Sequence, residues 1–98
     1  MATPEGKVKK IVKEQLKALG AYWHMPVQNG LGSPSLDFNV CYKGHFIAIE
    51  TKADGKQPTP RQENTMREIT AAGGLALVIS TEADAKKLAD TVRNFYGD

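Results

Sequence analysis

Two carboxylates and a lysine stand at the two ends of one short stretch, "LDFNVCYKGHFIAIETK" (36–52). Asp37 lies near its start, and Glu50 and Lys52 lie at its end. The intervening sequence is typical of β-strands, in which a buried charge is costly unless something pairs with it. These three side chains therefore require partners, which are either one another or a bound cation.

A hairpin brings the three side chains to one face of a sheet. The stretch predicts strands over 36–42 and 45–52, joined by a tight Lys-Gly turn. In that register Asp37 lies directly opposite Glu50, with Cβ atoms about 4.5–5.5 Å apart. Lys52 is two residues beyond Glu50, so it points to the same face.

Facing carboxylates repel each other, and one of them is pushed towards its neutral form. A divalent cation removes that penalty. Mg²⁺ binds few carboxylate oxygens and keeps several waters, which leaves room for a phosphate. A nearby lysine can position or deprotonate a water, or stabilise charge on the phosphate. The alternative is a cross-strand ion pair between Lys52 and Asp37 or Glu50, with no metal.

The other elements follow from apolar spacing, capping residues and glycines. They are predicted as a helix at 4–19, an extended segment at 21–27, a helix at 60–72, a strand at 75–80 and a helix at 82–96. The apolar run "LALVIS" is typical of a strand buried on both faces, and the last helix carries the stripe Ala85, Leu88, Val92 and Phe95. The predicted order is α-β-β-α-β-α, with a further strand near 21–27 left open. The crossover from 45 to 80 requires parallel strands, so the fold is α/β, with helices on a small mixed sheet.

Length and composition describe one small domain over 1–98. The chain is 41% hydrophobic and 24% charged, which is ordinary for a globular protein. Its core is thin, so dimerisation is expected to help. The net charge of +2 is a weak indication of an anionic partner. With one cysteine, Cys41, and no apolar run or leader pattern, the sequence favours an intracellular protein without a membrane span.

The order of these features resembles the PD-(D/E)XK nuclease superfamily, and within it the stand-alone form of the virus-type replication-repair nuclease (VRR-NUC) domain. The residues that carry the resemblance are Glu5, "NGLGSPS", Asp37, Gly44, Glu50-Thr51-Lys52, "TPRQ" with Gln62, and Gly73-Gly74 before "LALVIS". Together they span about residues 5 to 80. The sequence departs from the family at Leu36, where the family has a proline, although Pro34 stands two positions earlier.

The resemblance implies a restriction-endonuclease-like core and a metal-dependent endonuclease that hydrolyses DNA. Mg²⁺ or Mn²⁺ would be bound by Asp37, Glu50 and the backbone carbonyl of Thr51, with Lys52 near the attacking water and Gln62 in support. The implied substrate is branched DNA, such as a four-way (Holliday) junction, flap or fork, met in DNA repair or recombination. We expect a homodimer acting in a bacterial or phage-infected cell.

The glutamate of the first helix has two candidates. Glu5 falls on the apolar arc of Val12 and Leu16, which faces the sheet, whereas Glu14 falls on the outer side. Glu5 is therefore the better site residue, although the helix dipole alone favours a carboxylate in a first turn. The role of Gln62 is also open between support of the site and helix capping, because it stands at the position of a capping-box glutamine.

Several cations are candidate DNA contacts. Lys56 and Arg61 follow the Glu-X-Lys segment, while Lys10 and Lys13 lie on the outer face of the first helix, where a solvated surface is the alternative. Cys41 and His45 are interpreted as local structure near the hairpin turn, because two ligands do not make a zinc site. His24 is interpreted as packing near the sheet edge, with a contact to substrate as the alternative. Two other functions stay open: a nuclease directed at RNA, and a non-catalytic nucleic-acid-binding module that keeps the fold.

Overall fold

A single mixed sheet organises the structure, a computed structural model that describes residues 3–27 and 32–97. The strand order is β1-β2-β3-β4. β1 pairs antiparallel with β2, and β2 with β3, whereas β3 and β4 are parallel as predicted. The strands are β1 (Tyr22–His24), β2 (Phe38–Tyr42), β3 (His45–Thr51) and β4 (Leu75–Ile79). The additional strand left open near 21–27 is therefore present as β1. Part of the loop predicted at 28–35, residues 28–31, lies outside the described residues.

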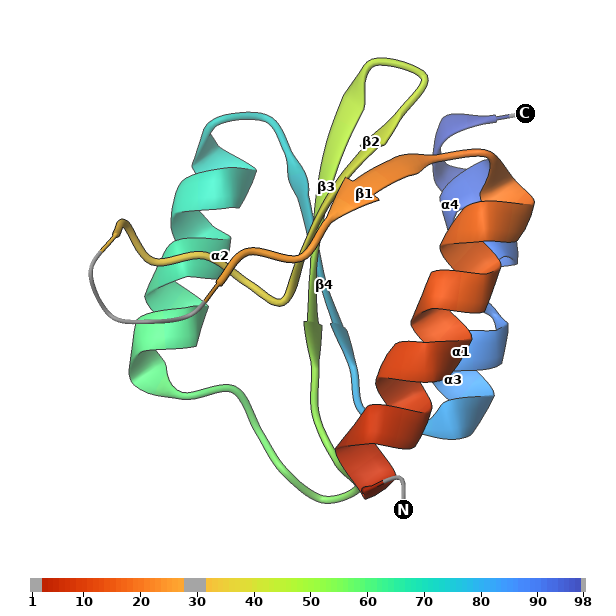
Figure 1. Ribbon diagram of the computed structural model, residues 1–98. Coiled ribbons are helices and arrows are strands. Elements are labelled where there is room, and N and C mark those ends of the chain that lie inside the picture. The colour runs from red at the N-terminus through yellow and green to blue at the C-terminus, as the bar shows by residue number, and fades with distance from the viewer. Residues whose placement is uncertain (1–2, 28–31, 98) are drawn as a thin grey trace.

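Helices cover both faces of this sheet. Figure 1 shows α2 on one side, and α1, α3 and α4 together on the other. The helices are α1 (Pro4–Leu19), α2 (Pro60–Ala71), α3 (Glu82–Lys86) and α4 (Leu88–Tyr96). This arrangement confirms the predicted α/β fold, a small mixed sheet flanked by helices. Within residues 3–27 and 32–97, no helix combines the length and apolar character needed to cross a membrane.

α1 begins and ends where its sequence predicts. The Thr3 side chain accepts a hydrogen bond from the backbone N–H of Gly6, and Gly20 ends the helix with φ of 75°, a conformation that favours glycine. One face of the helix is buried in the core that it shares with the sheet, α3 and α4, through Val8, Val12, Leu16 and Leu19. The outer lysines are exposed. α1 therefore covers one face of the sheet together with α3 and α4.

The hairpin of β2 and β3 has the predicted register. Tyr42 pairs with His45, and the ladder continues to Phe38 opposite Ile49. Both turn residues have positive φ, 49° at Lys43 and 82° at Gly44, as a two-residue turn with this twist requires. The hairpin buries its apolar residues against α1, α3 and α4 through Phe38, Val40, Tyr42, Ile47 and Ile49.

The predicted burial of β4 on both faces is wrong. Ile79 is its only buried residue, and Val78 is 40% exposed. β4 lies at the end of the strand order, so it has a neighbouring strand on one side only. An apolar run in the sequence does not distinguish such an edge strand from a central one.

The predicted single helix at 82–96 is two helices. α3 ends at Lys86 and α4 begins at Leu88, with Lys87 between them. The buried stripe runs through Ala85, Leu88, Ala89 and Val92, whereas Phe95, predicted to lie on it, is 65% exposed. The Phe95 ring instead meets the ring of Tyr96 edge to face.

This packing predicts unequal costs for two truncations in α4. Leu88→Ala should lower the free energy of unfolding by about 2–5 kcal/mol, because Leu88 is buried and its removal leaves a cavity. Phe95→Ala removes a larger side chain but should cost less than about 1 kcal/mol, because that ring is mostly exposed. Urea unfolding followed by circular dichroism measures both. Equal losses would place Phe95 in the core, as the sequence pattern predicted.

Candidate active site

Asp37 is anchored to the end of β3. It lies one residue before Phe38, the first paired residue of β2. Its Oδ2 accepts hydrogen bonds from the backbone N–H of Thr51, at 2.9 Å, and from the Thr51 hydroxyl, at 2.7 Å. Asp37 thus reaches across to β3 through its side chain, although the backbone ladder has already ended. These bonds hold Asp37 close to Glu50, the residue before Thr51, as the hairpin register predicted.

Glu50 lies in β3 and is only 4% exposed. Its Oε2 accepts a hydrogen bond from Nε2 of Gln62 at 2.9 Å. The Nζ of Lys52 lies 3.7 Å from the same oxygen, and the Lys52 side chain is 13% exposed. The structure therefore brings Lys52 to the face of Glu50, as predicted. The same contact is the ion pair between Lys52 and Glu50 that was the alternative to a metal site.

Gln62 caps α2 and also forms a hydrogen bond with Glu50. Its Oε1 accepts a hydrogen bond from the backbone N–H of Thr59 at 2.9 Å, while the Thr59 hydroxyl accepts from the N–H of Gln62 at 3.2 Å. This reciprocal capping box fixes the start of α2. Because the other end of the same amide bonds to Glu50, capping the helix also orients the site carboxylate.

The electrostatic environment of Glu50 disfavours its charged form. Burial of the carboxyl and, next, the negative charge of Asp37 raise the pKa of Glu50 to about 7. Lys52 and the backbone N–H of Asp37 act in the opposite direction, and the charge of Glu5 adds a smaller increase. A carboxylate held in this way gains most from a cation that neutralises it and its neighbour.

The donor set suits a hard divalent cation. Asp37, Glu50 and the carbonyl of Thr51 offer oxygen atoms only, which Mg²⁺ and Mn²⁺ prefer. Among the described residues, no group of three or more His, Cys, Asp or Glu side chains is placed to bind a metal. Two carboxylates and a carbonyl would leave several coordination positions for water and substrate.

Glu5 is the glutamate of α1 whose charge reaches the site. It raises the pKa of Glu50, whereas Glu14 is exposed and is not among the groups that do so. The N-terminal end of α1 lies beside the C-terminal end of β3 (Figure 1). Glu5 also pairs with Lys9 at 3.3 Å, one turn along the helix. The carboxylate is therefore shared between a local ion pair and the field of the site.

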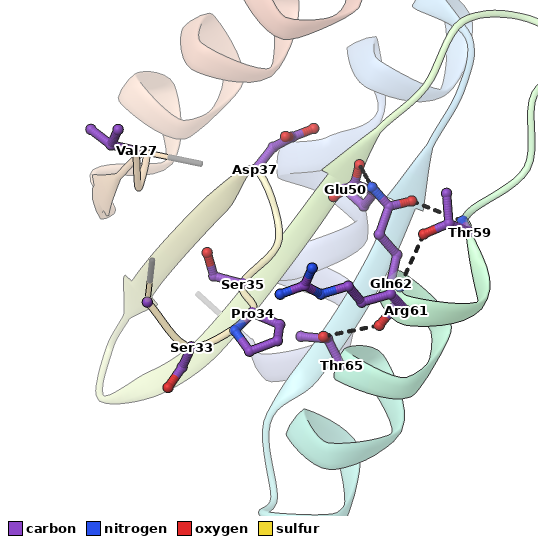
Figure 2. A pocket seen from close by; sticks show the side chains of 11 residues that line it. Val27, Ser33, Pro34, Ser35, Asp37, Glu50, Thr59, Arg61, Gln62 and Thr65 are labelled. Atoms are coloured by element: carbon purple, nitrogen blue, oxygen red, sulfur yellow. Dashed lines mark hydrogen bonds between the residues drawn. The ribbon is translucent and has the colours of Figure 1, made fainter. Parts of the chain in front are cut away.

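A cavity of about 410 Å³ opens beside the two carboxylates. We call it the site pocket. Figure 2 shows Asp37 and Glu50 at one end of it, with residues of α2 and of the segment before β2 along its walls. Its described lining is Val27, Gly32, Ser33, Pro34, Ser35, Asp37, Glu50, Thr59, Arg61, Gln62 and Thr65.

The site pocket separates the predicted DNA contacts into two groups. Arg61 lines it, whereas Lys10, Lys13 and Lys56 do not and are exposed elsewhere. Thr65 lines it without having been predicted. The signal for Thr65 was its position one turn after Arg61, whose carbonyl accepts a hydrogen bond from the Thr65 hydroxyl at 3.1 Å.

The other candidate ligands are structural or distant. His45 stacks on Tyr96 with ring centroids 3.9 Å apart, and neither His24 nor Cys41 lines the site pocket. Their interpretation as local structure agrees with these positions.

Comparison with known proteins identifies the fold. No family model matches the sequence, and no curated protein does. Among solved structures, a chain described as "VRR_NUC domain" superposes with a TM-score of 0.76 at 27% sequence identity, covering 97% of this chain and 99% of that one. The chain folds as a VRR-NUC domain. The VRR-NUC resemblance predicted from the order of Glu5, Asp37, the Glu-X-Lys segment and Gln62 is thereby confirmed at the level of the domain, and a nuclease-type domain is supported.

The raised pKa of Glu50 predicts how the metal-free VRR-NUC domain responds to pH. Folded Glu50 keeps its proton up to about pH 7, whereas the unfolded group releases it near 4.5. The folded state therefore binds more protons in this window, and the free energy of unfolding falls as pH rises through it. Glu50→Gln removes that titration, so in EDTA the variant should exceed wild type in stability at about pH 8, and by less at about pH 5.

Urea unfolding at the two pH values measures this difference. Glu14→Gln is the matched control, because Glu14 is exposed on the same protein and its replacement should leave the pH dependence unchanged. A Glu50→Gln variant whose stability follows pH as wild type does would contradict the environment described for Glu50.

Proposed function

We propose that the protein is a metal-dependent endonuclease that hydrolyses phosphodiester bonds in DNA. The observation that carries this proposal is the meeting of Asp37, Glu50 and Lys52 at the end of β3, beside a pocket, in a VRR-NUC fold. Two carboxylates at this position repel a DNA phosphate, so they are unsuited to binding DNA without a cation. The arrangement therefore supports catalysis over a binding-only module.

In this proposal each residue has a defined task. Asp37, Glu50 and the carbonyl of Thr51 hold Mg²⁺ or Mn²⁺, which when bound supplies Lewis-acid polarisation of the phosphate and lowers the pKa of water. Thr51 also fixes Asp37 through two hydrogen bonds, and Gln62 fixes Glu50. These contacts hold both carboxylates in place before substrate arrives.

Lys52 acts on the reacting groups themselves. Its ammonium lies 3.7 Å from Glu50, at the edge of the carboxylate pair. From there it orients the attacking water and donates hydrogen bonds to the phosphate oxygens, where negative charge increases as the water oxygen bonds to phosphorus. As it bonds, the attacking water releases a proton to solvent. The bond from phosphorus to the leaving oxygen then breaks, and that oxygen takes a proton from solvent.

Branched DNA, such as a four-way junction, flap or fork, is the proposed substrate. The basis is the resemblance to stand-alone VRR-NUC domains, together with a small chain that has few elements for reading base edges. A digestion panel tests it: junction, flap, linear duplex, single-stranded DNA and RNA, each with Mg²⁺, Mn²⁺ or EDTA. Cleavage of RNA alone would favour the RNA-directed alternative.

Substitution of the three central residues tests the mechanism. Asp37→Asn, Glu50→Gln and Lys52→Ala should each lower cleavage by about 10²-fold or more, because each removes a metal ligand or the group next to the attacking water. Only the first two should weaken Mn²⁺ binding measured by calorimetry. Glu14→Gln, at an exposed site of α1, is the control and should cleave as wild type does. Near-wild-type cleavage by Asp37→Asn or Glu50→Gln would overturn the metal site.

We also propose that the active form is a homodimer. A domain of this size has a thin core, and Val78 leaves part of the edge strand β4 exposed. A two-fold dimer matches the two-fold symmetry of a four-way junction, and two chains, each of net charge +2, double the electrostatic attraction to DNA. Light scattering at micromolar concentration should give the mass of a dimer. A monomeric mass that persists with junction DNA, together with full cleavage, would exclude this assembly.

A further inference from the structure

Arg61 extends across the site pocket. Figure 2 shows its guanidinium leaving α2 and pointing over the pocket towards Pro34 and Ser35 on the opposite wall. It is the only lysine or arginine among the described residues that line the pocket. Within residues 3–27 and 32–97, no carboxylate forms an ion pair with it. The guanidinium is therefore available to an anion that enters the pocket.

The position of Arg61 relative to the carboxylates is fixed by the backbone. Arg61 directly precedes Gln62, whose amide bonds to both Thr59 and Glu50. Its carbonyl accepts a hydrogen bond from the Thr65 hydroxyl at 3.1 Å, one turn further along α2. The first turn of α2 is thus attached to Glu50, so the backbone from which the exposed Arg61 side chain extends is held beside the carboxylate pair.

The site pocket contains two carboxylates, so binding of a phosphate there is favoured by a positively charged side chain. Asp37 and Glu50 lie at one end of the pocket, and Lys52 pairs with Glu50 without lining the pocket. On each side of the phosphate that is attacked, the substrate strand carries a further phosphate. Binding of these neighbouring phosphates is also favoured by positive charge. A guanidinium binds a phosphate through two parallel hydrogen bonds, which fixes its orientation as well as its position.

We propose that Arg61 binds a non-scissile phosphate adjacent to the bond that is cut, and that the site pocket holds the nucleotide between the two. A cavity of about 410 Å³ is in the range of sites for small ligands, about 300–1,000 Å³. This inference rests on the proposed function. Arg61 then sets which phosphodiester bond faces Asp37 and Glu50, because the strand is held at two points.

A comparison of two arginines on α2 tests the proposal. Arg61→Ala should raise KM for a junction substrate by about tenfold and change kcat less than about threefold, because the contact is made equally in the ground and transition states. Arg67→Ala removes the same charge from the same helix, but Arg67 lies outside the site pocket and contacts Asn64 at 3.4 Å. Its KM should change less than about twofold. Arg61→Lys should recover part of the loss, since a lysine keeps the charge without the paired donors.

Single methylphosphonate substitutions locate the contact. Each removes the charge of one phosphate, and the series places one at every position within two nucleotides of the cut. Neutralising the phosphate that Arg61 binds should raise the KM of wild type by about the factor seen for Arg61→Ala, and should have no further effect on that variant. Additive losses at every position would overturn the assignment, as would equal losses in Arg61→Ala and Arg67→Ala.

The failure of this inference differs from the failure of the proposed function. If wild type cleaves and Asp37→Asn does not, but Arg61→Ala keeps the KM of wild type, the nuclease assignment stands and the Arg61 contact is wrong. If wild type cleaves nothing in the panel, the nuclease assignment fails. Anisotropy of labelled junction DNA with Mg²⁺ present, which in this case leaves the DNA uncut, then decides Arg61 on binding alone: a loss confined to Arg61→Ala supports the phosphate contact, and unchanged binding overturns it.

Discussion

Burial of the Glu50 carboxyl is unfavourable, because the side chain is only 4% exposed and lies near the negative charge of Asp37. The surrounding structure offsets part of this cost. Gln62 donates a hydrogen bond to it, Lys52 lies 3.7 Å away, and Thr51 binds the neighbouring carboxylate. These partners reduce the cost of burial without removing it, since the pKa of Glu50 stays raised at about 7. A bound cation would offset the remaining cost, because an opposite charge nearby favours the charged form of a carboxylate.

Three separate elements converge on this carboxylate. The hairpin register brings Asp37 to β3, the parallel pairing of β3 with β4 supports the strand from its other side, and the capped start of α2 supplies Gln62. The end of α1 that carries Glu5 lies beside the same strand end. The fold therefore gathers residues from four parts of the chain at one end of the sheet. This convergence depends on the packing of α1 and α2 around the sheet as well as on the hairpin turn.

Local signals were sufficient for much of this arrangement. A two-residue turn with glycine sets the hairpin register, and a Thr-Pro pair marks where each of α1 and α2 begins. The positions of Asp37, Glu50 and Gln62 were therefore predictable from short-range chemistry. The exposure of Val78 and Phe95 was not, because it depends on which elements lie next to β4 and on the break at Lys87. The direction of the Arg61 side chain depends likewise on the wall formed around Pro34 and Ser35, which lies far from it in sequence.

Gln62 links the stability of α2 to the geometry of the site. Its amide is satisfied at both ends, by the N–H of Thr59 and by Glu50. A helix start that frayed would release Thr59 and allow the amide to turn away, leaving a buried carboxylate oxygen with one partner fewer. A movement of Glu50 would in turn weaken the capping box. Because each contact constrains the other, the start of α2 and the end of β3 behave as one unit, and Arg61, the residue between Pro60 and Gln62, is positioned by that unit.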